Sequence, residues 1–576
     1  MPKPNNRTMK QAFAYLHGFR GKLAFLLIVI IIGIALNNVS PILYGRLIDA
    51  ITAKEFSQTT VHLMFFAAIT IAIVLLSSLE SVVSVNVGNR IINHHQTRCF
   101  SKLLKTQMSH VEKFEFGLLV SNLTSDISTI VRYNIELLTT VIFMSLNFIV
   151  PLLFIFLINW KLALVTIAFL PVTMVIYYAH KNKKKLFFKQ SREMDDKYYA
   201  FVCNSIRNIP SFKAYKLEEK ISGNFEELMD DSYQKEKNKT ILDTFVGMLN
   251  DLSQNIFSFV LLYLAARLIV NDELSIGVLM SFTIYTNRLF SSITTLQKIK
   301  LDEQPVRVAL DRLSSLLAAP EDDYSRNRQN LATHQTKLEL DHLSFHYDDL
   351  EVIKGLSLTI QDKGFYSLVG ENGSGKTTLF KLMMDFYQAQ SGQLKLNDTP
   401  YPNLSSAYIR SFITYVHKDP FVVNDTLLEN IRLYSALEED QVLEVCERVG
   451  LKEFILSLPD KLDTMLFEDS DLLSSGMLQK LSFARALLHP SAIMLFDEIT
   501  SDLDGKSEKQ LCQIMKELSR DRIVLSISHR MNAIVDSDWI FVLEDGRIVD
   551  QGDFHTLSKT NVLFSNLFRA ALAQHA

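Results

Sequence analysis

The sequence has few cysteines, and their spacing argues against two classes of protein. The four cysteines, Cys99, Cys203, Cys446 and Cys512, form no C-x-x-C pair and no spacing typical of a zinc site. A disulfide-stapled secreted scaffold and a structural zinc protein are therefore both disfavoured.

The sequence also lacks an excess of positive charge and a recognisable signal peptide. Its formal net charge is −4 over 576 residues, so no basic field argues for binding to nucleic acid. No short apolar core with a cleavage site stands at the N-terminus. Hydrophobic residues, by contrast, make up 48% of the chain. The mean hydropathy of +0.13 is high for a soluble protein, and the length exceeds that of one ordinary domain.

Apolar segments in the first half predict six transmembrane helices that extend into the cytosol. Each segment is long enough to cross a bilayer, and a buried helix of a soluble protein rarely stays apolar for about twenty residues. Six core helices of a soluble protein are the alternative. The segments are residues 23–44, 61–85, 137–157, 162–178, 245–270 and 276–296.

The charges beside these segments predict their orientation. Residues 1–22 carry basic residues and no acid, a second basic cluster lies at 180–185, and the short loop 271–274 is acidic. Basic ends stay inside, so both termini are expected to be cytoplasmic. Residues 1–22 are predicted to form an interfacial helix, with a disordered basic tail as the alternative. Within the segments, Asp251 and Arg288 are candidates for a translocation pathway, unless they pair structurally or sit near the membrane boundary.

A phosphate-binding loop organises the second half of the chain. Residues 370–378 match G-x-x-x-x-G-K-[ST] between an apolar run and a predicted helix, which is the context that the motif needs. Its glycines let backbone N–H groups surround phosphate oxygens. A glycine turn before an ordinary helix is the alternative. The predicted ATP-binding residues are Gly370, Glu371, Asn372, Gly373, Ser374, Gly375, Lys376, Thr377 and Thr378.

Acidic residues follow a second apolar strand. Asp497 is expected to join Thr377 in holding Mg²⁺, and Glu498 is expected to polarise an attacking water. His529 stands at the tip of another apolar strand. Alone it would be a structural histidine, but beside these motifs it is predicted to contact the γ-phosphate.

The sequence therefore predicts four parts. Residues 1–22 form the interfacial helix and 23–317 a six-helix transmembrane domain. Residues 318–336 are polar and interrupted, as in a linker, and 337–576 alternate strand and helix as an α/β nucleotide-binding domain.

Residues 473–487, which begin Leu-Ser-Ser-Gly-Met, resemble the signature motif of ATP-binding cassette (ABC) proteins. The order of membrane bundle and then cassette resembles an exporter half-transporter over nearly the whole chain. The resemblance implies an α-helical membrane domain followed by an α/β phosphate-loop ATPase domain. It also implies that two chains pair, with each ATP between the phosphate loop of one chain and the signature of the other. The signature residues are Ser474, Ser475 and Gly476.

The resemblance assigns roles to further residues. Tyr347 looks like the aromatic that stacks on adenine, and Asp504 lies in a segment that resembles the loop joining the two sites. Glu468 resembles an acid that touches the partner's coupling loop. Segments 124–131 and 208–215 look like the helices that carry motion between cassette and membrane.

The chain departs from the family pattern at three places. Ser475 and Met477 replace a glycine and a glutamine of the signature, and an added side chain crowds a close approach to phosphate. Lys418 replaces a glutamine that helps to coordinate Mg²⁺. Because an ammonium cannot ligate a cation, Lys418 cannot take over this role. The glycines that usually flank Glu468 are replaced by Phe467 and Ser470.

An intact phosphate loop beside an altered signature is the pattern expected of the hydrolysing partner in a heterodimer. The predicted function is ATP-driven export of an amphipathic peptide, drug or lipid across the cytoplasmic membrane of a bacterium, with ATP and Mg²⁺ as cofactors. The expected partners are a second half-transporter, membrane lipid and the cargo, with no nucleic acid. The alternative is an ATP-binding membrane subunit that regulates a partner without transporting. An exporter that cleaves its peptide cargo would need an N-terminal protease domain, and only about twenty residues precede the first span.

Overall fold

The computed structural model describes residues 13–114, 116–299, 303–322, 336–467, 472–489, 491–500, 502–528 and 530–573. The chain divides into two compact units, which are described separately. The first unit comprises Met1–Lys102 and Glu115–Ala318, and the second comprises Leu103–Phe114 and Ala319–Ala576.

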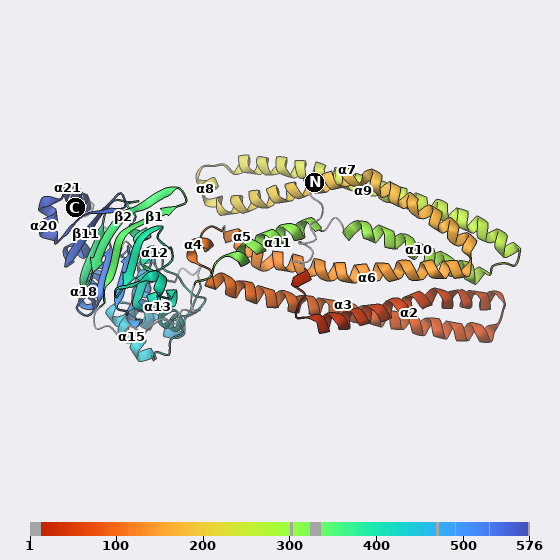
Figure 1. Ribbon diagram of the computed structural model, residues 1–576, viewed down its shortest axis with the longest axis horizontal. Coiled ribbons are helices and arrows are strands. Elements are labelled where there is room, and N and C mark those ends of the chain that lie inside the picture. The colour runs from red at the N-terminus through yellow and green to blue at the C-terminus, as the bar shows by residue number, and fades with distance from the viewer. Residues whose placement is uncertain are drawn as a thin grey trace. The chain divides into compact units, whose positions relative to one another are not determined.

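Long helices make up the first unit (Figure 1). The six longest are α2 (Arg20–Thr52), α3 (Phe56–Lys105), α6 (Ile127–Ile158), α7 (Trp160–Arg207), α9 (Glu218–Val270) and α10 (Ile276–Ile299). The shorter elements are α5 (Phe116–Ser121), the π-helix η1 (Asn122–Asp126), α8 (Ile209–Ala214) and α11 (Glu303–Ala318). The predicted helical fold of the first half is confirmed.

Five stretches of helix in the described residues are long and apolar enough to cross a membrane by length and composition. They lie in α2, in α3, in the continuous run from α5 through η1 to α6, in α7 and in α9. The sixth predicted segment forms α10, a helix of 24 residues that includes the polar Asn287 and Arg288. A sixth crossing therefore stays a prediction.

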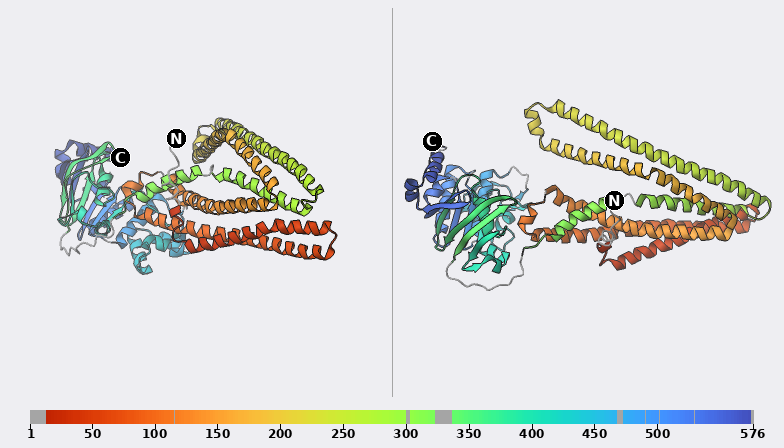
Figure 2. Two further views of the ribbon diagram at one scale, coloured as in Figure 1. Left: turned by 45° about the vertical axis from the view of Figure 1, so that its right-hand side comes forward. Right: turned by 45° about the horizontal axis from the view of Figure 1, so that its top comes forward.

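Polar contacts join the extended ends of α7 and α9, which run side by side (Figure 2). Lys184 Nζ lies 2.7 Å from Asp243 Oδ1, and Ser191 Oγ donates to Glu236 Oε2 at 2.7 Å. These parts of the two helices are charged, in contrast to their apolar spans. These polar pairs therefore hold α7 and α9 together beyond the point where their apolar interface ends.

The crossing of α2 and α10 depends on two glycines. A Cβ atom added to Gly277 would lie 2.0 Å from the carbonyl oxygen of Gly45, so no larger residue fits there without a shift. Asp49 strengthens the crossing by accepting the Gly277 N–H at 2.8 Å. Further along, the guanidinium of Arg288 donates to the carbonyl and the side-chain oxygen of Asn37, both at 2.7 Å.

Arg288 and Asp251, the two candidates for a translocation pathway, lie in different environments. Arg288 is half-buried and bonded to Asn37, which favours the structural alternative for this residue. Asp251 is exposed on α9 of the single chain, so its role stays a prediction.

The first predicted coupling segment forms no separate short helix, so its role stays a prediction. Residues 124–131 lie inside the continuous helix of η1 and α6, whereas the chain turns earlier, at Gln107, and forms the short helix α4 (Met108–Val111). After α4, Glu112 pairs with Lys381 at 3.0 Å and with the Tyr387 hydroxyl, all within the second unit. The second segment, 208–215, does contain a short helix, α8.

The predicted N-terminal helix falls mostly on residues 1–12, which lie outside the described residues. Within the described part, residues 15–18 form turns and α2 begins at Arg20.

Three sheets form the second unit. The central sheet has the order β12-β11-β3-β10-β9-β6, in which every neighbouring pair is parallel except β12 and β11. Its strands are β3 (Gly364–Val369), β6 (Ile413–Val416), β9 (Ile493–Asp497), β10 (Ile523–Ile527), β11 (Trp539–Glu544) and β12 (Arg547–Gly552). All residues of β9 and β10 are buried, as continuous apolar strands of a covered parallel sheet should be.

The second sheet is antiparallel, with the order β2-β1-β4-β5, and the third pairs β7 with β8. Their strands are β1 (Leu338–Tyr347), β2 (Leu350–Ile360), β4 (Ser391–Leu396), β5 (Thr399–Pro400), β7 (Asp425–Thr426) and β8 (Met465–Leu466). The helices are α12 (Lys376–Met383), η2 (Tyr401–Asn403), α13 (Ser406–Phe412), α14 (Leu427–Arg432), α15 (Glu439–Arg448), α16 (Lys452–Ser457), η3 (Lys461–Asp463), α17 (Ser475–Leu488), α18 (Gly505–Leu518), α19 (Met531–Val535), α20 (Phe554–Thr560) and α21 (Val562–Ala573). The predicted α/β fold of the second half is confirmed.

All four cysteines are free thiols. Cys99, Cys446 and Cys512 are buried, and Cys203 on α7 is exposed.

Candidate functional site

The site forms at the carboxyl edge of the parallel strands. The loop at 370–375 follows β3, Glu498 follows β9, Ser528 follows β10 and Lys418 comes shortly after β6. Because parallel strands end at the same edge of a sheet, these residues come together although up to 158 positions separate them (Gly370 and Ser528). Ligands of open α/β sheets bind at this edge.

Backbone geometry requires glycine in the phosphate-binding loop. A Cβ atom on Gly370 would lie 2.1 Å from the carbonyl oxygen of Leu543. Gly375 has φ +105°, where side chains are strained, and a Cβ there would lie 2.9 Å from Ile353. Gly375 also precedes α12, so the N–H groups of the loop lie close to the N-terminus of this helix.

Lys376 and Ser374 carry the polar groups of this loop. Lys376 is buried, and its Nζ donates to the carbonyls of Gly370 at 2.9 Å and Glu371 at 2.8 Å. Burial lowers the pKa of this ammonium, while the carboxylates of Glu498 and Asp497 oppose that shift. Ser374 Oγ is buried and has no hydrogen-bond partner in the described part of the chain. An orphaned hydroxyl and a buried cation in a glycine cradle fit a phosphate group.

Asp497 lies fully buried at the end of β9. Its carboxylate accepts the Tyr415 hydroxyl at 2.9 Å and the Thr377 hydroxyl at 3.3 Å. Burial raises the pKa of Asp497, and the two hydroxyls reduce that shift only in part. A buried carboxylate beside a threonine hydroxyl is an oxygen donor set that fits Mg²⁺.

Glu498 adopts an uncommon backbone conformation directly after Asp497. Its φ is +51°, and its N–H donates to the carbonyl of Ile527 at 3.0 Å. A residue other than glycine in this region costs of order 1–3 kcal/mol and persists only where the surroundings hold it. The link to β10 supplies such a restraint and leaves the Glu498 side chain half-buried at the site.

Tyr347 ends β1 and is half-buried among aromatic rings. Its ring meets Phe345 and Tyr387 edge-on, with centroids 4.8 Å and 5.2 Å away. These contacts fix the ring, so stacking on adenine stays a reasonable prediction.

The signature residues begin α17 and are open to contact. Ser474 and Ser475 are exposed, and Ser474 Oγ accepts the Met477 N–H at 3.3 Å as the helix cap. The loop around Asp502 packs here, because its N–H donates to Gln479 Oε1 at 3.3 Å and its carbonyl lies 3.3 Å from the Cβ position of Gly476. Signature and loop thus form one surface.

Asp504 has a structural task in this chain. It caps α18 by accepting the N–H groups of Ser507 and Lys506 at 2.9 Å, and these bonds hold the pKa of its carboxyl below the usual value. A coupling role for Asp504 would come in addition to this cap.

Of three further predicted residues, only Lys418 falls within the part of the chain that the structure describes. Lys418 is exposed and forms no ion pair among the residues that the structure describes. Glu468 and His529 lie outside the described residues.

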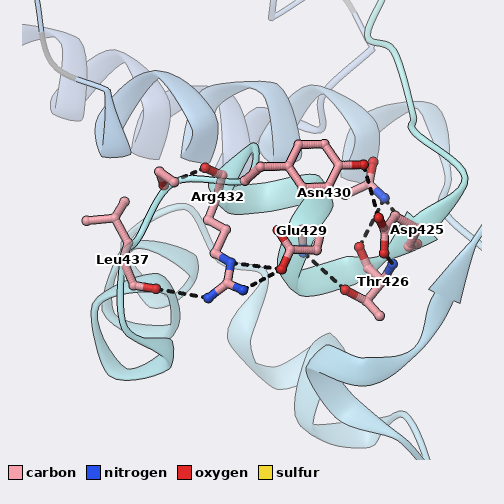
Figure 3. Close-up of polar contacts among 8 residues, drawn as sticks. Asp425, Thr426, Glu429, Asn430, Arg432 and Leu437 are labelled. Atoms are coloured by element: carbon pink, nitrogen blue, oxygen red, sulfur yellow. Dashed lines mark hydrogen bonds and ion pairs between the residues drawn. The ribbon is translucent and has the colours of Figure 1, made fainter.

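Sequence reasoning missed a buried hydrogen-bond network that connects two parts of the site. Asn430 on α14 donates to the carbonyls of Thr426 at 3.0 Å and Asp425 at 3.2 Å (Figure 3). It also donates to the Val423 carbonyl at 2.7 Å. Arg485 on α17 donates to the Asn430 carbonyl at 2.6 Å.

Arg485 also ties the signature helix to the chain that follows Lys418. Its guanidinium donates to the Phe421 carbonyl at 2.7 Å and stacks on the Phe421 ring at 4.2 Å. Burial lowers the pKa of Arg485 to about 10. The only signal in the sequence was an arginine inside the otherwise apolar half of α17.

A helical unit with apolar spans and a phosphate-loop unit with this site define a membrane-bound ATPase. The family model described as the ABC transporter transmembrane region matches residues 23–293, and the model described as ABC transporter matches residues 353–501. The chain belongs to the ABC transporters, as an exporter half-transporter in which both regions are fused. It is a multi-pass plasma-membrane protein that couples ATP hydrolysis to transport.

Relatives match nearly the whole chain. An uncharacterized ABC transporter ATP-binding protein, YknV of Bacillus subtilis, is 27% identical over 94% of this chain and 91% of its own length. The multidrug resistance-like protein MdlB of Buchnera aphidicola is 24% identical over 98% of both chains. The leukotoxin translocation protein LktB of Mannheimia haemolytica is 27% identical over 93% of this chain and 76% of its own length.

A solved structure shares the fold. The structure of a bacterial Atm1-family ABC exporter with ATP bound has a TM-score of 0.81 and 21% identity, covering 96% of this chain and 99% of that chain.

Proposed function

We propose that the chain exports an amphipathic peptide, drug or lipid as the hydrolysing half of a heterodimer. One observation carries this proposal: the sequence keeps its phosphate loop, Asp497 and Glu498, whereas the exposed signature has Ser475 where the family has glycine. Its own ATP would then meet the partner's signature, and its altered signature would meet the partner's ATP. Relatives named for drug resistance and toxin translocation support an exported cargo.

Each site residue has a role in this proposal. The loop around Lys376 binds the phosphates, Thr377 and Asp497 hold Mg²⁺, and Glu498 polarises the attacking water. Bound Mg²⁺ would neutralise charge on the phosphates. His529 contacts the γ-phosphate, and both termini face the cytoplasm.

Substitution of Glu498 tests the catalytic assignment. In vesicles that contain the chain with its partner, Glu498→Gln should still bind ATP but hydrolyse it about 10²–10⁴-fold more slowly, because a general base is lost. Uptake of an amphipathic dye should stop with it. Glu444→Gln, an exposed carboxylate on α15, is the matched control. Hydrolysis at the normal rate by Glu498→Gln would show that another group activates the water.

Purification of the chain alone tests the heterodimer. A stable homodimer with full transport-linked ATPase activity would contradict it.

A second function is favoured by Lys418, which is exposed and cannot ligate Mg²⁺. The chain would then bind ATP to regulate a partner. Nucleotide turnover in sealed vesicles without movement of any solute would support this alternative.

A further inference from the structure

A cavity of about 730 Å³ lies in the first unit, between the beginning of α7 and the end of α9. Its walls include Leu162 and Val165 from α7 and Leu264, Arg267 and Leu268 from α9. This volume falls in the range of about 300–1,000 Å³ that is usual for sites of small organic ligands. The nucleotide site uses none of these residues.

The inner wall of the cavity is apolar. Leu162 is buried, and Val165, Leu264 and Leu268 pack on the same hydrophobic cluster as Phe257 and Phe282. A hydrated ion or a free phosphate would gain nothing from this wall, whereas hydrocarbon chains would gain about 25 cal/mol per Å² buried.

Among the residues that line the cavity, cations outnumber carboxylates. Lys161 and Arg267 contribute two cations, and Glu273 contributes one carboxylate, which lies 3.8 Å from Lys161. Arg267 is exposed and forms no ion pair with any residue that the structure describes. A cation in the last turn of α9 also suits the helix dipole. That effect explains a basic residue there but not the apolar cavity beneath it.

The cavity lies at the ends of two apolar spans. Both α7 and α9 contain stretches that could cross a membrane, and the cavity lies where these stretches meet their turns. Trp160 and Tyr263, at or beside the cavity, are 59% and 65% exposed. Tryptophan and tyrosine are enriched at the headgroup level of bilayers. These residues place the mouth at the headgroups and the apolar wall at the acyl chains.

We propose that this cavity binds one anionic phospholipid from the surrounding leaflet. The phosphate would contact Arg267, and the acyl chains would lie along Leu162, Val165 and Leu268. The net positive lining favours a lipid with an anionic headgroup over a zwitterionic one. This inference depends on neither the cargo nor the heterodimer.

Native mass spectrometry of the full chain tests this site. The protein is released from neutral detergent after addition of either phosphatidylglycerol or phosphatidylcholine. The wild type should retain one more lipid molecule per chain when phosphatidylglycerol is added than when phosphatidylcholine is added. Arg267→Gln should reduce that retention about tenfold, and Arg267→Lys should preserve most of it, because a point charge still pairs with phosphate. Arg207→Gln, an exposed arginine at the other end of α7, should retain as much as the wild type.

A second variant tests the cavity itself. Ala266→Trp fills space at the wall and should lower the retention of both lipids. Equal retention of the two lipids by the wild type, or unchanged retention by Arg267→Gln, would overturn the proposal. Full retention by Ala266→Trp would show that the lipid binds elsewhere.

Discussion

At the scale of single residues, Asp497 is a carboxyl group whose burial makes its ionised form unfavourable for folding. Burial raises its pKa above that of the unfolded chain. Its contribution to stability is therefore full below the unfolded pKa and is lost as the pH rises through the folded pKa. At neutral pH the ionised carboxylate opposes folding, and a bound divalent cation would offset this cost.

Asp497→Asn should separate stability from function. Without nucleotide at pH 7.5, the variant should unfold at a higher temperature than the wild type, since no charge is buried. The gap in unfolding temperature should narrow as the pH falls toward the raised pKa of Asp497, because the wild-type carboxyl then takes up a proton. The rise in unfolding temperature that Mg-ATP gives to the wild type should disappear.

Thermal unfolding of the full chain with and without Mg-ATP measures both effects. Asp521→Asn, at an exposed turn, is the control and should leave both unchanged. A variant that keeps the Mg-ATP effect would show that Asp497 does not hold the cation.

At the scale of elements, the crossing of α2 and α10 depends on the absence of two side chains. Gly277→Ala should destabilise this crossing by about 1–3 kcal/mol, because the added Cβ meets backbone of α2 that cannot move aside alone. Gly33→Ala on α2 meets no atom within 4 Å and should have little effect. Unfolding in mixed micelles compares the two variants. Equal stabilities of Gly277→Ala and Gly33→Ala would mean that α2 and α10 can move apart to admit the added Cβ atom without loss of stability.

The elements also show what a sequence can and cannot predict. Apolar length and the spacing of the phosphate loop depend on local sequence, so the long helices and the meeting of Lys376, Thr377 and Asp497 were predictable. The bond from Tyr415 to Asp497 joins residues 82 positions apart, and no local pattern encodes it. The sequence analysis did not predict the turn at Gln107 and the short helix α4 that follows it.

At the scale of the whole molecule, the exposed start of α17 indicates a site that is completed by another chain. Restoring the family residues with Ser475→Gly and Met477→Gln should therefore raise the ATPase rate of the chain purified alone. We expect an increase of roughly tenfold, which corresponds to about 1.4 kcal/mol of the barrier. A glycine would remove the side chain that crowds the opposed phosphate.

Steady-state phosphate release measures this effect. Met477→Leu is the control: it keeps a side chain of similar size but does not introduce the amide of glutamine, so the ATPase rate should not change. An unchanged rate in the double variant would show that Ser475 does not limit hydrolysis in paired copies of this chain.

The distribution of thiols has a practical consequence. Burial raises the pKa of both Cys446 and Cys512 to about 12, and Cys99 is enclosed, so these three present little thiolate to a reagent at neutral pH. Cys203 alone is open. A maleimide fluorophore should thus attach at one position of the wild-type chain, near the end of α7. With an acceptor dye on the partner subunit, energy transfer from this label would report the separation of the two subunits while ATP turns over, with no engineered cysteine in this chain.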